Sequence, residues 1–80
     1  MHELGLARSI AAIAEEHAKG RQIKEVRVAI GPQACVERGA LEFCWNLVTE
    51  ASDIAGAALG FIDAERDTFL VRELEFMEDA

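Results

Sequence analysis

Residues 26–52, VRVAIGPQACVERGALEFCWNLVTEAS, change from one hydrophobic period to another within a few positions. The stretch begins inside a run, residues 24–31, in which apolar and other side chains alternate, and this alternation predicts a half-buried strand. The sequence Gly-Pro-Gln at 31–33 ends the strand, because glycine and proline interrupt regular structure. Residues 37–51 then predict a helix, whose apolar stripe consists of Ala40, Cys44, Leu47, Val48 and Ala51, widened by Leu41 and Phe43.

Three more elements are expected on either side of this stretch. Residues 4–19 predict an amphipathic helix with one face made of Leu6, Ile10, Ile13, Ala14 and His17. Residues 57–62 and 69–77 predict two strands, and the polar link at 63–68 is so short that we expect an antiparallel hairpin. The alternation of the last strand shifts by one residue near Arg72 and Glu73, which indicates a β-bulge.

The element order is therefore α-β-α-β-β, and the expected fold class is α/β of the α+β kind. Each amphipathic helix must bury one stripe, so we expect both helices to pack on one face of a three-stranded sheet. The strand edges are then thinly covered, which favours pairing with another chain, and a homodimer is one possible outcome. Trp45 lies off the main stripe of its helix and is expected either to cover the sheet edge or to mark a partner surface. The predicted core consists of Leu6, Ile10, Ile13, Val26, Val28, Ile30, Phe43, Leu47, Val48, Leu59, Phe61, Val71, Leu74 and Phe76.

Length and composition limit the classes of protein to which the chain can belong. The 80 residues predict one domain, residues 1–80. The net charge of −7 argues against nucleic-acid binding, and no apolar run approaches the roughly 18 residues that a membrane span needs. There is no nucleophile–base pair and no phosphate-binding glycine loop, so an enzyme is not expected. No signal peptide is visible, and the cytoplasm is the expected compartment.

Cys35 and Cys44 are the two cysteines, and their spacing matches no zinc-ligand pattern. In a cytosolic chain such cysteines are most often small buried hydrophobic residues. His17 lies on the apolar side of the first helix near its end, where it is expected to cap carbonyls or to pack rather than to bind metal.

The first three residues, Met1, His2 and Glu3, combine groups that could chelate one metal ion. The α-amine of Met1, the backbone nitrogen of His2 and a ring nitrogen of His2 can close two small chelate rings. The backbone nitrogen of Glu3, once deprotonated, could add a fourth nitrogen in the same plane. The Glu3 carboxylate could bind the metal through an axial oxygen, or it could hold the ligands in place without binding the metal itself. Four planar nitrogens suit Ni(II) or Cu(II), whereas zinc prefers a tetrahedron.

Three stretches, MHELGLARSI, the central VRVAIGPQACVERGALEFCWNLVTEAS, and AGAALGFI with a later LEF strand, resemble the HypA/HybF family of hydrogenase nickel-incorporation proteins. The resemblance covers nearly the whole chain. It implies a metallochaperone that passes Ni(II) to a maturing nickel–iron hydrogenase or, in some organisms, towards urease. The implied ligands are Met1 through its amine, His2 through its ring and backbone, and Glu3 through its backbone or carboxylate. The implied partners are a maturation GTPase and the hydrogenase large-subunit precursor.

The sequence departs from this family between its last two strands. Family members carry a second small domain there, in which two Cys-x-x-Cys-type pairs hold a structural zinc ion. Here the short connection at 63–68 takes that place and no such pair exists, so we expect no zinc. The alternative is a metal-free interaction module that pairs with a full-length relative or with the GTPase.

Overall fold

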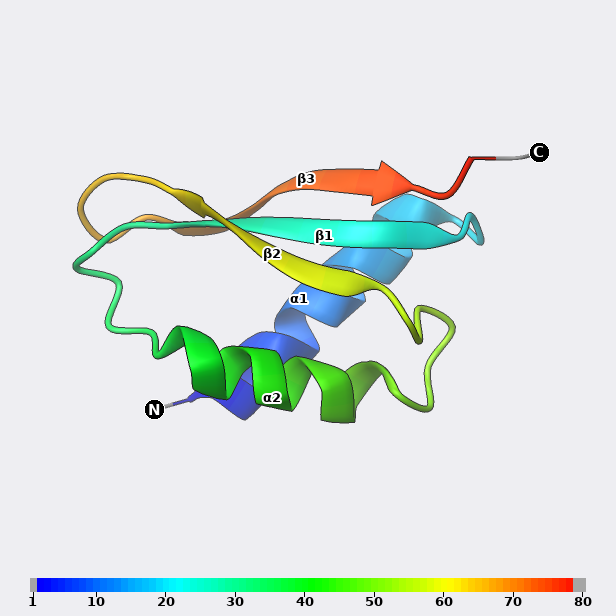
Figure 1. Ribbon diagram of the computed structural model, residues 1–80, viewed down its shortest axis with the longest axis horizontal. Coiled ribbons are helices and arrows are strands. Elements are labelled where there is room, and N and C mark those ends of the chain that lie inside the picture. The colour runs from blue at the N-terminus through cyan, green and yellow to red at the C-terminus, as the bar shows by residue number, and fades with distance from the viewer. Residues whose placement is uncertain (1, 79–80) are drawn as a thin grey trace.

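The computed structural model describes residues 2–78. It contains two helices, α1 (Glu3–Ala18) and α2 (Arg38–Thr49), and three strands, β1 (Ile23–Ile30), β2 (Ala58–Asp63) and β3 (Phe69–Phe76). Figure 1 shows both helices on the same side of the sheet, so the predicted element order and layering are confirmed. Over the part of the chain that is described, no helix is long and apolar enough to cross a membrane.

The central strand of the sheet is β1, because the strand order is β2-β1-β3. It pairs in parallel with β2 and antiparallel with β3. The predicted hairpin between β2 and β3 is therefore wrong, since β1 lies between them. Two strand spacings amount to about 10 Å, and the five residues from 64 to 68 can span about 16 Å. A short link limits the distance between two strands but does not require them to be neighbours.

The predicted bulge in β3 is confirmed. Arg27 lies opposite Glu73, whereas the next residue, Val28, lies opposite Val71, so Arg72 is the extra residue. An extra residue changes the phase of the alternation. Val71 and Leu74 consequently lie opposite Val28 and Val26, on one face of the sheet.

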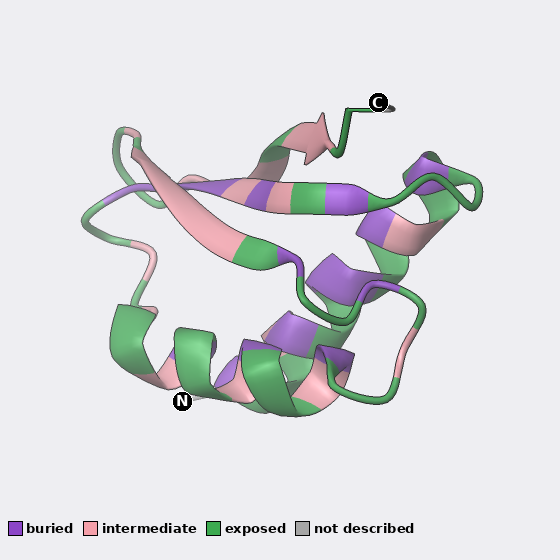
Figure 2. Cartoon of the chain, turned by 45° about the vertical axis from the view of Figure 1, so that its right-hand side comes forward, coloured by how far each residue is buried: buried purple, intermediate pink, exposed green. Residues whose placement is uncertain are grey.

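The core lies between the sheet and the two helices, as the purple segments of Figure 2 show. Four alanines of α1, at positions 7, 11, 14 and 18, are buried, and their small side chains allow the helix to pack closely. Four predicted core residues are buried: Ile10, Val26, Val28 and Ile30. Seven others are partly buried against them: Leu6, Val48, Leu59, Phe61, Val71, Leu74 and Phe76.

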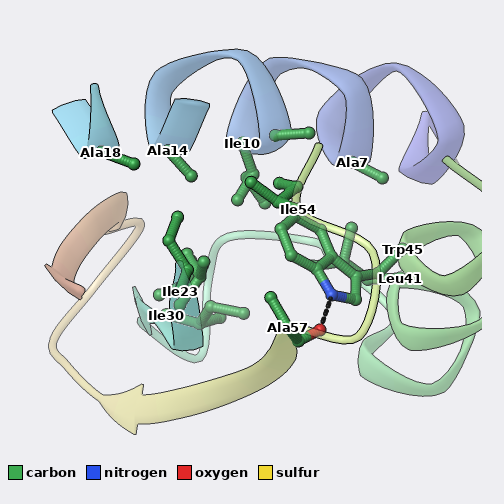
Figure 3. Close-up of a cluster of buried hydrophobic side chains, with 13 residues drawn as sticks. Ala7, Ile10, Ala14, Ala18, Ile23, Ile30, Leu41, Trp45, Ile54 and Ala57 are labelled. Carbon is green, nitrogen blue, oxygen red and sulfur yellow. Dashed lines mark hydrogen bonds between the residues drawn. The ribbon is translucent and has the colours of Figure 1, made fainter. Parts of the chain in front are cut away.

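The predicted apolar stripe of α2 is only partly confirmed. Leu41 is buried, and Cys44 and Val48 are partly buried against the core. Leu41, Trp45 and Thr49 are the buried residues of α2, whereas Phe43 is 66% exposed and Leu47 is 53% exposed. Trp45 is 1% exposed, and its Nε1 donates a hydrogen bond of 2.8 Å to the carbonyl oxygen of Ala57 (Figure 3). The indole thus buries its ring while its polar atom is satisfied. Trp45 is a core residue and marks no partner surface, and its hydrogen bond to Ala57 places it beside the start of β2, an edge strand of the sheet.

The predicted core also fails at Ile13 of α1, which is 41% exposed. Its neighbours in the helical stripe, Ile10 and Ala14, are buried. Ile13 lies at the margin of the buried face, beside Val71 and Leu74 of β3, because β3 is an edge strand and nothing described continues the sheet beyond it.

Replacing Phe43 with serine is expected to change the free energy of unfolding by no more than about 0.5 kcal/mol, because exposed side chains contribute little to stability. Urea unfolding followed by the fluorescence of the single tryptophan would measure the change. A loss above about 2 kcal/mol would show that Phe43 is buried in solution.

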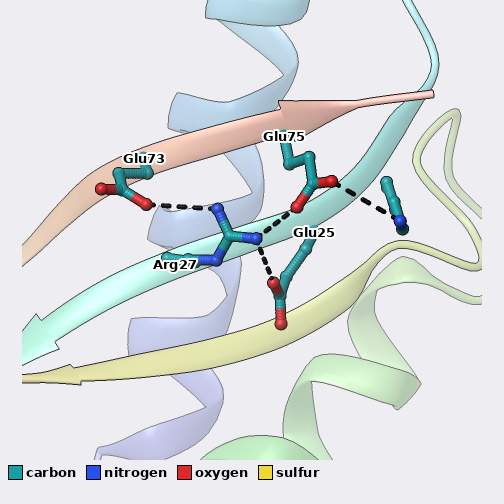
Figure 4. Close-up of polar contacts among 5 residues, drawn as sticks. Glu25, Arg27, Glu73 and Glu75 are labelled. Carbon is teal, nitrogen blue, oxygen red and sulfur yellow. Dashed lines mark hydrogen bonds and ion pairs between the residues drawn. The ribbon is translucent and has the colours of Figure 1, made fainter. Parts of the chain in front are cut away.

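A network of charged side chains lies on the other face of the sheet, around Arg27 (Figure 4). The guanidinium contacts Glu25 at 2.8 Å and Glu73 at 3.2 Å, and it also pairs with Glu75. Lys24 lies 3.5 Å from Glu75. The hydrogen bond from Arg27, followed by the charge of Lys24, lowers the pKa of the Glu75 carboxyl below its ordinary value.

This network predicts that acid weakens the fold. A carboxyl whose pKa is lowered by folding stabilises the protein above its unfolded pKa, and this stabilisation is lost as the pH falls through the folded pKa. We expect Arg27→Met to make the loss of stability below about pH 4.5 shallower than in the unmodified chain. Thermal unfolding at a series of pH values would test this, with Arg8→Met as the control for removal of an exposed arginine. Parallel profiles for the unmodified chain and Arg27→Met would contradict the role of Arg27.

Candidate metal site

The candidate site lies at the start of α1. His2 is the N-cap residue, and its carbonyl oxygen accepts the first helical hydrogen bond, from the backbone nitrogen of Leu6 at 2.9 Å. The side chain of His2 is exposed and makes no capping hydrogen bond. The first N–H groups of a helix have no partner within the helix, so the ladder of α1 does not need the backbone nitrogens of His2 and Glu3. Met1, the third predicted ligand residue, lies outside the described residues.

Glu3 is only 8% exposed, although it is charged and lies in the first turn of α1. Its Oε2 accepts a hydrogen bond of 3.1 Å from the backbone nitrogen of Glu37. The pKa of the Glu3 carboxyl is lowered from 4.5 to about 2, first by a hydrogen bond from the N-terminal amine and then by the Glu37 N–H. The carboxylate therefore fixes the start of α1 against the start of α2.

Glu37 is a residue of this region that the sequence analysis missed. It is the N-cap of α2, and its carboxylate accepts hydrogen bonds from the backbone nitrogens of Ala40 at 2.8 Å and Gly39 at 3.2 Å. Its own backbone nitrogen holds Glu3. An acidic residue immediately before a predicted helix was the available signal for the cap, but nothing in the sequence indicated the contact with Glu3.

A hollow of about 410 Å³ opens beside Glu3. Its walls come from the end of β1, the following turn and the start of α2: Ile30, Gly31, Pro32, Cys35, Val36, Glu37 and Arg38. Cys35 is exposed, so the expectation of a buried thiol is wrong there, whereas Cys44 is partly buried against the core. Both cysteines are free.

The connection between β2 and β3 fixes the turn that forms part of this wall. The backbone nitrogen of Gly31 donates to the carbonyl oxygen of Thr68 at 2.8 Å, and that of Gln33 donates to Arg66 at 2.8 Å. A Cβ atom at position 31 would lie 2.2 Å from the carbonyl oxygen of Arg66, so only glycine fits there. The connection thus holds in place the segment that leads to Glu37.

His17, the other histidine, lies near the opposite end of α1 from His2. It is exposed rather than on the buried side, and its Nδ1 donates a hydrogen bond of 2.9 Å to the carbonyl oxygen of Ile13. This carbonyl lies within α1 and is not one of the free carbonyls at the end of the helix, so the bond is not a cap. Among residues 2–78, no group of three or more His, Cys, Asp or Glu side chains is arranged to hold a metal ion.

Comparison with known proteins gives consistent matches. The family described as "Hydrogenase/urease nickel incorporation, metallochaperone, hypA" matches residues 1–68. The hydrogenase maturation factor HypA of Trichodesmium erythraeum is 40% identical over 62 residues, which cover 78% of this chain and 54% of that protein. The corresponding factor of Nostoc punctiforme is 35% identical over 63 residues, which cover 79% and 56%.

A solved structure has the same fold. The solution structure of the Ni metallochaperone HypA from Helicobacter pylori matches with a TM-score of 0.72 and 29% identity, over 80% of this chain and 58% of that one. The chain spans just over half the length of the relatives that it matches. The family match begins at the Met-His-Glu opening and runs to the residue before β3. By its sequence and by its fold, the chain belongs to the HypA family.

Proposed function

We propose that this chain binds Ni(II) through Met1, His2 and Glu3 and delivers it during maturation of a nickel–iron hydrogenase. The observation that carries the proposal is the Met-His-Glu opening, which falls within the residues matched by a nickel-incorporation family. The names of the relatives, which are hydrogenase maturation factors, support the same role. Ni(II) is the cargo of such a protein.

The start of α1 suits this role chemically. The imidazole of His2 is exposed, and the backbone nitrogens of His2 and Glu3 are not needed for the hydrogen bonds of the helix. These three groups can therefore bind one metal ion together. The positive end of a helix dipole ordinarily disfavours a cation. Two deprotonated amides would offset the charge of Ni(II), so the dipole of α1 would weaken binding of the ion only slightly. Because the ligands must lose protons, affinity should fall with acid.

Glu3 contributes in two ways under this proposal. Its backbone nitrogen binds the metal, and its carboxylate, held by the N–H of Glu37, positions the first turn of α1. Glu37 is therefore a positioning residue. Ligands that are fixed before binding lose less conformational entropy when the ion arrives.

The remaining parts of the proposal rest on membership of the family and, for zinc, on the departure from the family between the last two strands. Residues 1–80 form one nickel-binding domain, in which the connection at 63–68 replaces the inserted zinc domain of relatives, and the protein holds no zinc. Its partners are a maturation GTPase and the hydrogenase large-subunit precursor, in the cytoplasm, and it catalyses no reaction itself.

Calorimetric titration of Ni(II) and Zn(II) into the chain with an authentic Met1 tests the site. We expect about one Ni(II) per chain, with weaker binding of Zn(II). Residues added before Met1 turn the amine into an amide and should lower the affinity for Ni(II) at least about 100-fold. Equal affinity in the extended chain would exclude the amine as a ligand.

A further inference from the structure

Helix α2 has apolar side chains on two sides, and only one of these sides is buried. Leu41 and Trp45 lie in the core (Figure 3). Phe43 and Leu47, which form the outer face of α2, lie one turn apart and are 66% and 53% exposed. Figure 2 shows that α2 is largely exposed on the side turned away from the sheet. A surface helix ordinarily carries polar residues there, so a second apolar face is unusual.

This outer face continues along the helix. Positions three and four apart are neighbours on a helical surface, and half-buried apolar residues therefore border Phe43 and Leu47: Ala40, Cys44 and Val48. The other large apolar side chains that are exposed lie singly on α1, on β3 and after β3. Apolar residues that lie together on a surface mark interaction sites more often than scattered ones.

The charges around the outer face are mostly acidic. Residues 37–54 contain four acidic side chains and one basic one. The basic one, Arg38, is already paired with Asp63 at 3.0 Å. Glu42 and Glu50 are exposed and form no ion pair within residues 2–78. Two carboxylates beside the outer face are therefore free to pair with cations of a partner.

The sign of these charges selects the kind of partner. A second copy of the chain would bring the same acidic side chains against Glu42 and Glu50, and the chain has a net charge of −7. The phosphates of a nucleic acid or of an anionic membrane would be repelled in the same way. Lysine and arginine are attracted instead. A helix can set apolar residues against Phe43 and Leu47 while basic residues on its flanks reach the carboxylates.

We propose that the outer face of α2 binds a basic amphipathic helix of a partner protein. The apolar residues of that helix cover Phe43 and Leu47, and its lysine or arginine side chains pair with Glu42 and Glu50. The contact is small, so the complex is weak and reversible. It requires no metal ion, and it does not depend on the proposed nickel site.

Two synthetic helical peptides test the surface on the full chain without metal. Both carry leucine at positions i, i+3, i+4 and i+7, and the remaining positions are lysine in one peptide and glutamate in the other. Titration of each peptide into isotope-labelled chain, followed by amide chemical shifts, locates the contact and gives its Kd. We expect the lysine peptide to shift the amides of residues 39–51, and the glutamate peptide to bind at least about tenfold more weakly.

Substitutions on the outer face test the apolar contact. Phe43→Ser and Leu47→Ser should each lower the affinity for the lysine peptide about tenfold, because each removes an apolar side chain that the peptide covers. Leu70→Ser is the matched control, since Leu70 is 45% exposed on β3. It should bind the lysine peptide as tightly as the unmodified chain does.

The double variant E42Q/E50Q tests the charges. It should reduce the difference in affinity between the two peptides, whereas E16Q/E65Q, which removes two exposed charges elsewhere, should leave that difference nearly unchanged.

Four results would overturn the proposal. They are no binding of the lysine peptide at about 1 mM, shifts confined to residues outside 39–51, equal affinity for the two peptides, and unchanged affinity in both serine variants while circular dichroism shows them folded. Sedimentation equilibrium on the chain alone tests the other occupant. A dimer that Phe43→Ser dissociates would assign the outer face to a second copy and would also overturn the proposal.

Discussion

Replacing Trp45 with alanine is expected to lower the free energy of unfolding by about 3–5 kcal/mol. The indole is 1% exposed and packs in the centre of the core, between the helices and the segment from Ile54 to Ala57. At about 0.05–0.15 kcal/mol per residue, a domain of this size has only about 4–12 kcal/mol of stability. The alanine variant should therefore lose at least about a quarter of the stability of the domain. Urea unfolding followed by circular dichroism would measure the loss, because the variant has no tryptophan.

Trp45→Phe is the matched control for this prediction. It keeps an aromatic ring in the core but removes the donor that satisfies the carbonyl oxygen of Ala57. A buried acceptor without a partner costs about 1–3 kcal/mol, so the loss should be smaller than for alanine. If both variants unfolded at the same urea concentration as the unmodified chain, the indole would not lie in the core.

Replacing His2 with alanine is expected to lower the affinity for Ni(II) at least about 100-fold, because the imidazole closes one of the proposed chelate rings. His2 is exposed at the N-cap of α1, and its side chain makes no capping hydrogen bond. The substitution should therefore leave the thermal unfolding midpoint nearly unchanged. Calorimetric titration of both chains, each with an authentic Met1, would measure the difference.

His17→Ala is the control, since His17 is the other histidine and is also exposed. It should bind Ni(II) as tightly as the unmodified chain. Equal affinity for His2→Ala and the unmodified chain would place the nickel site elsewhere, and equal losses in both variants would point to binding by scattered histidines.

The sequence predicted the positions of the helices and strands to within two residues, because hydrophobic periodicity is a local property. The order of the strands depends on which strand edges pair in three dimensions. The short link between β2 and β3 is compatible with a direct pairing of these strands and also with β1 lying between them. The sequence also left open which face of α2 is buried, because that too depends on contacts with distant residues. Phe43 with Leu47 and Leu41 with Trp45 are both apolar pairs at helical spacing, and only the contact of Trp45 with Ala57 distinguishes them.

The candidate site shows the same division between local and long-range information. Met1, His2 and Glu3 were predicted to be metal ligands because three consecutive residues supply an amine, backbone nitrogens and an imidazole. The resemblance to a family supported the same prediction. The hydrogen bond that holds Glu3 joins it to a residue 34 positions away. No spacing rule predicts such a contact, since it depends on how α1 and α2 cross. The sequence therefore indicated the proposed ligands but not the residue that positions them.

The position of β1 in the sheet has a consequence for synthesis on the ribosome. Its two neighbours come from later parts of the chain, so β1 is unpaired until β2 has emerged from the ribosome, and it keeps one open edge until β3 has emerged as well. A chain stalled after residue 68 would carry all the residues of the family match and still lack one side of its sheet. Such an intermediate is the species most prone to aggregate or to require a folding chaperone.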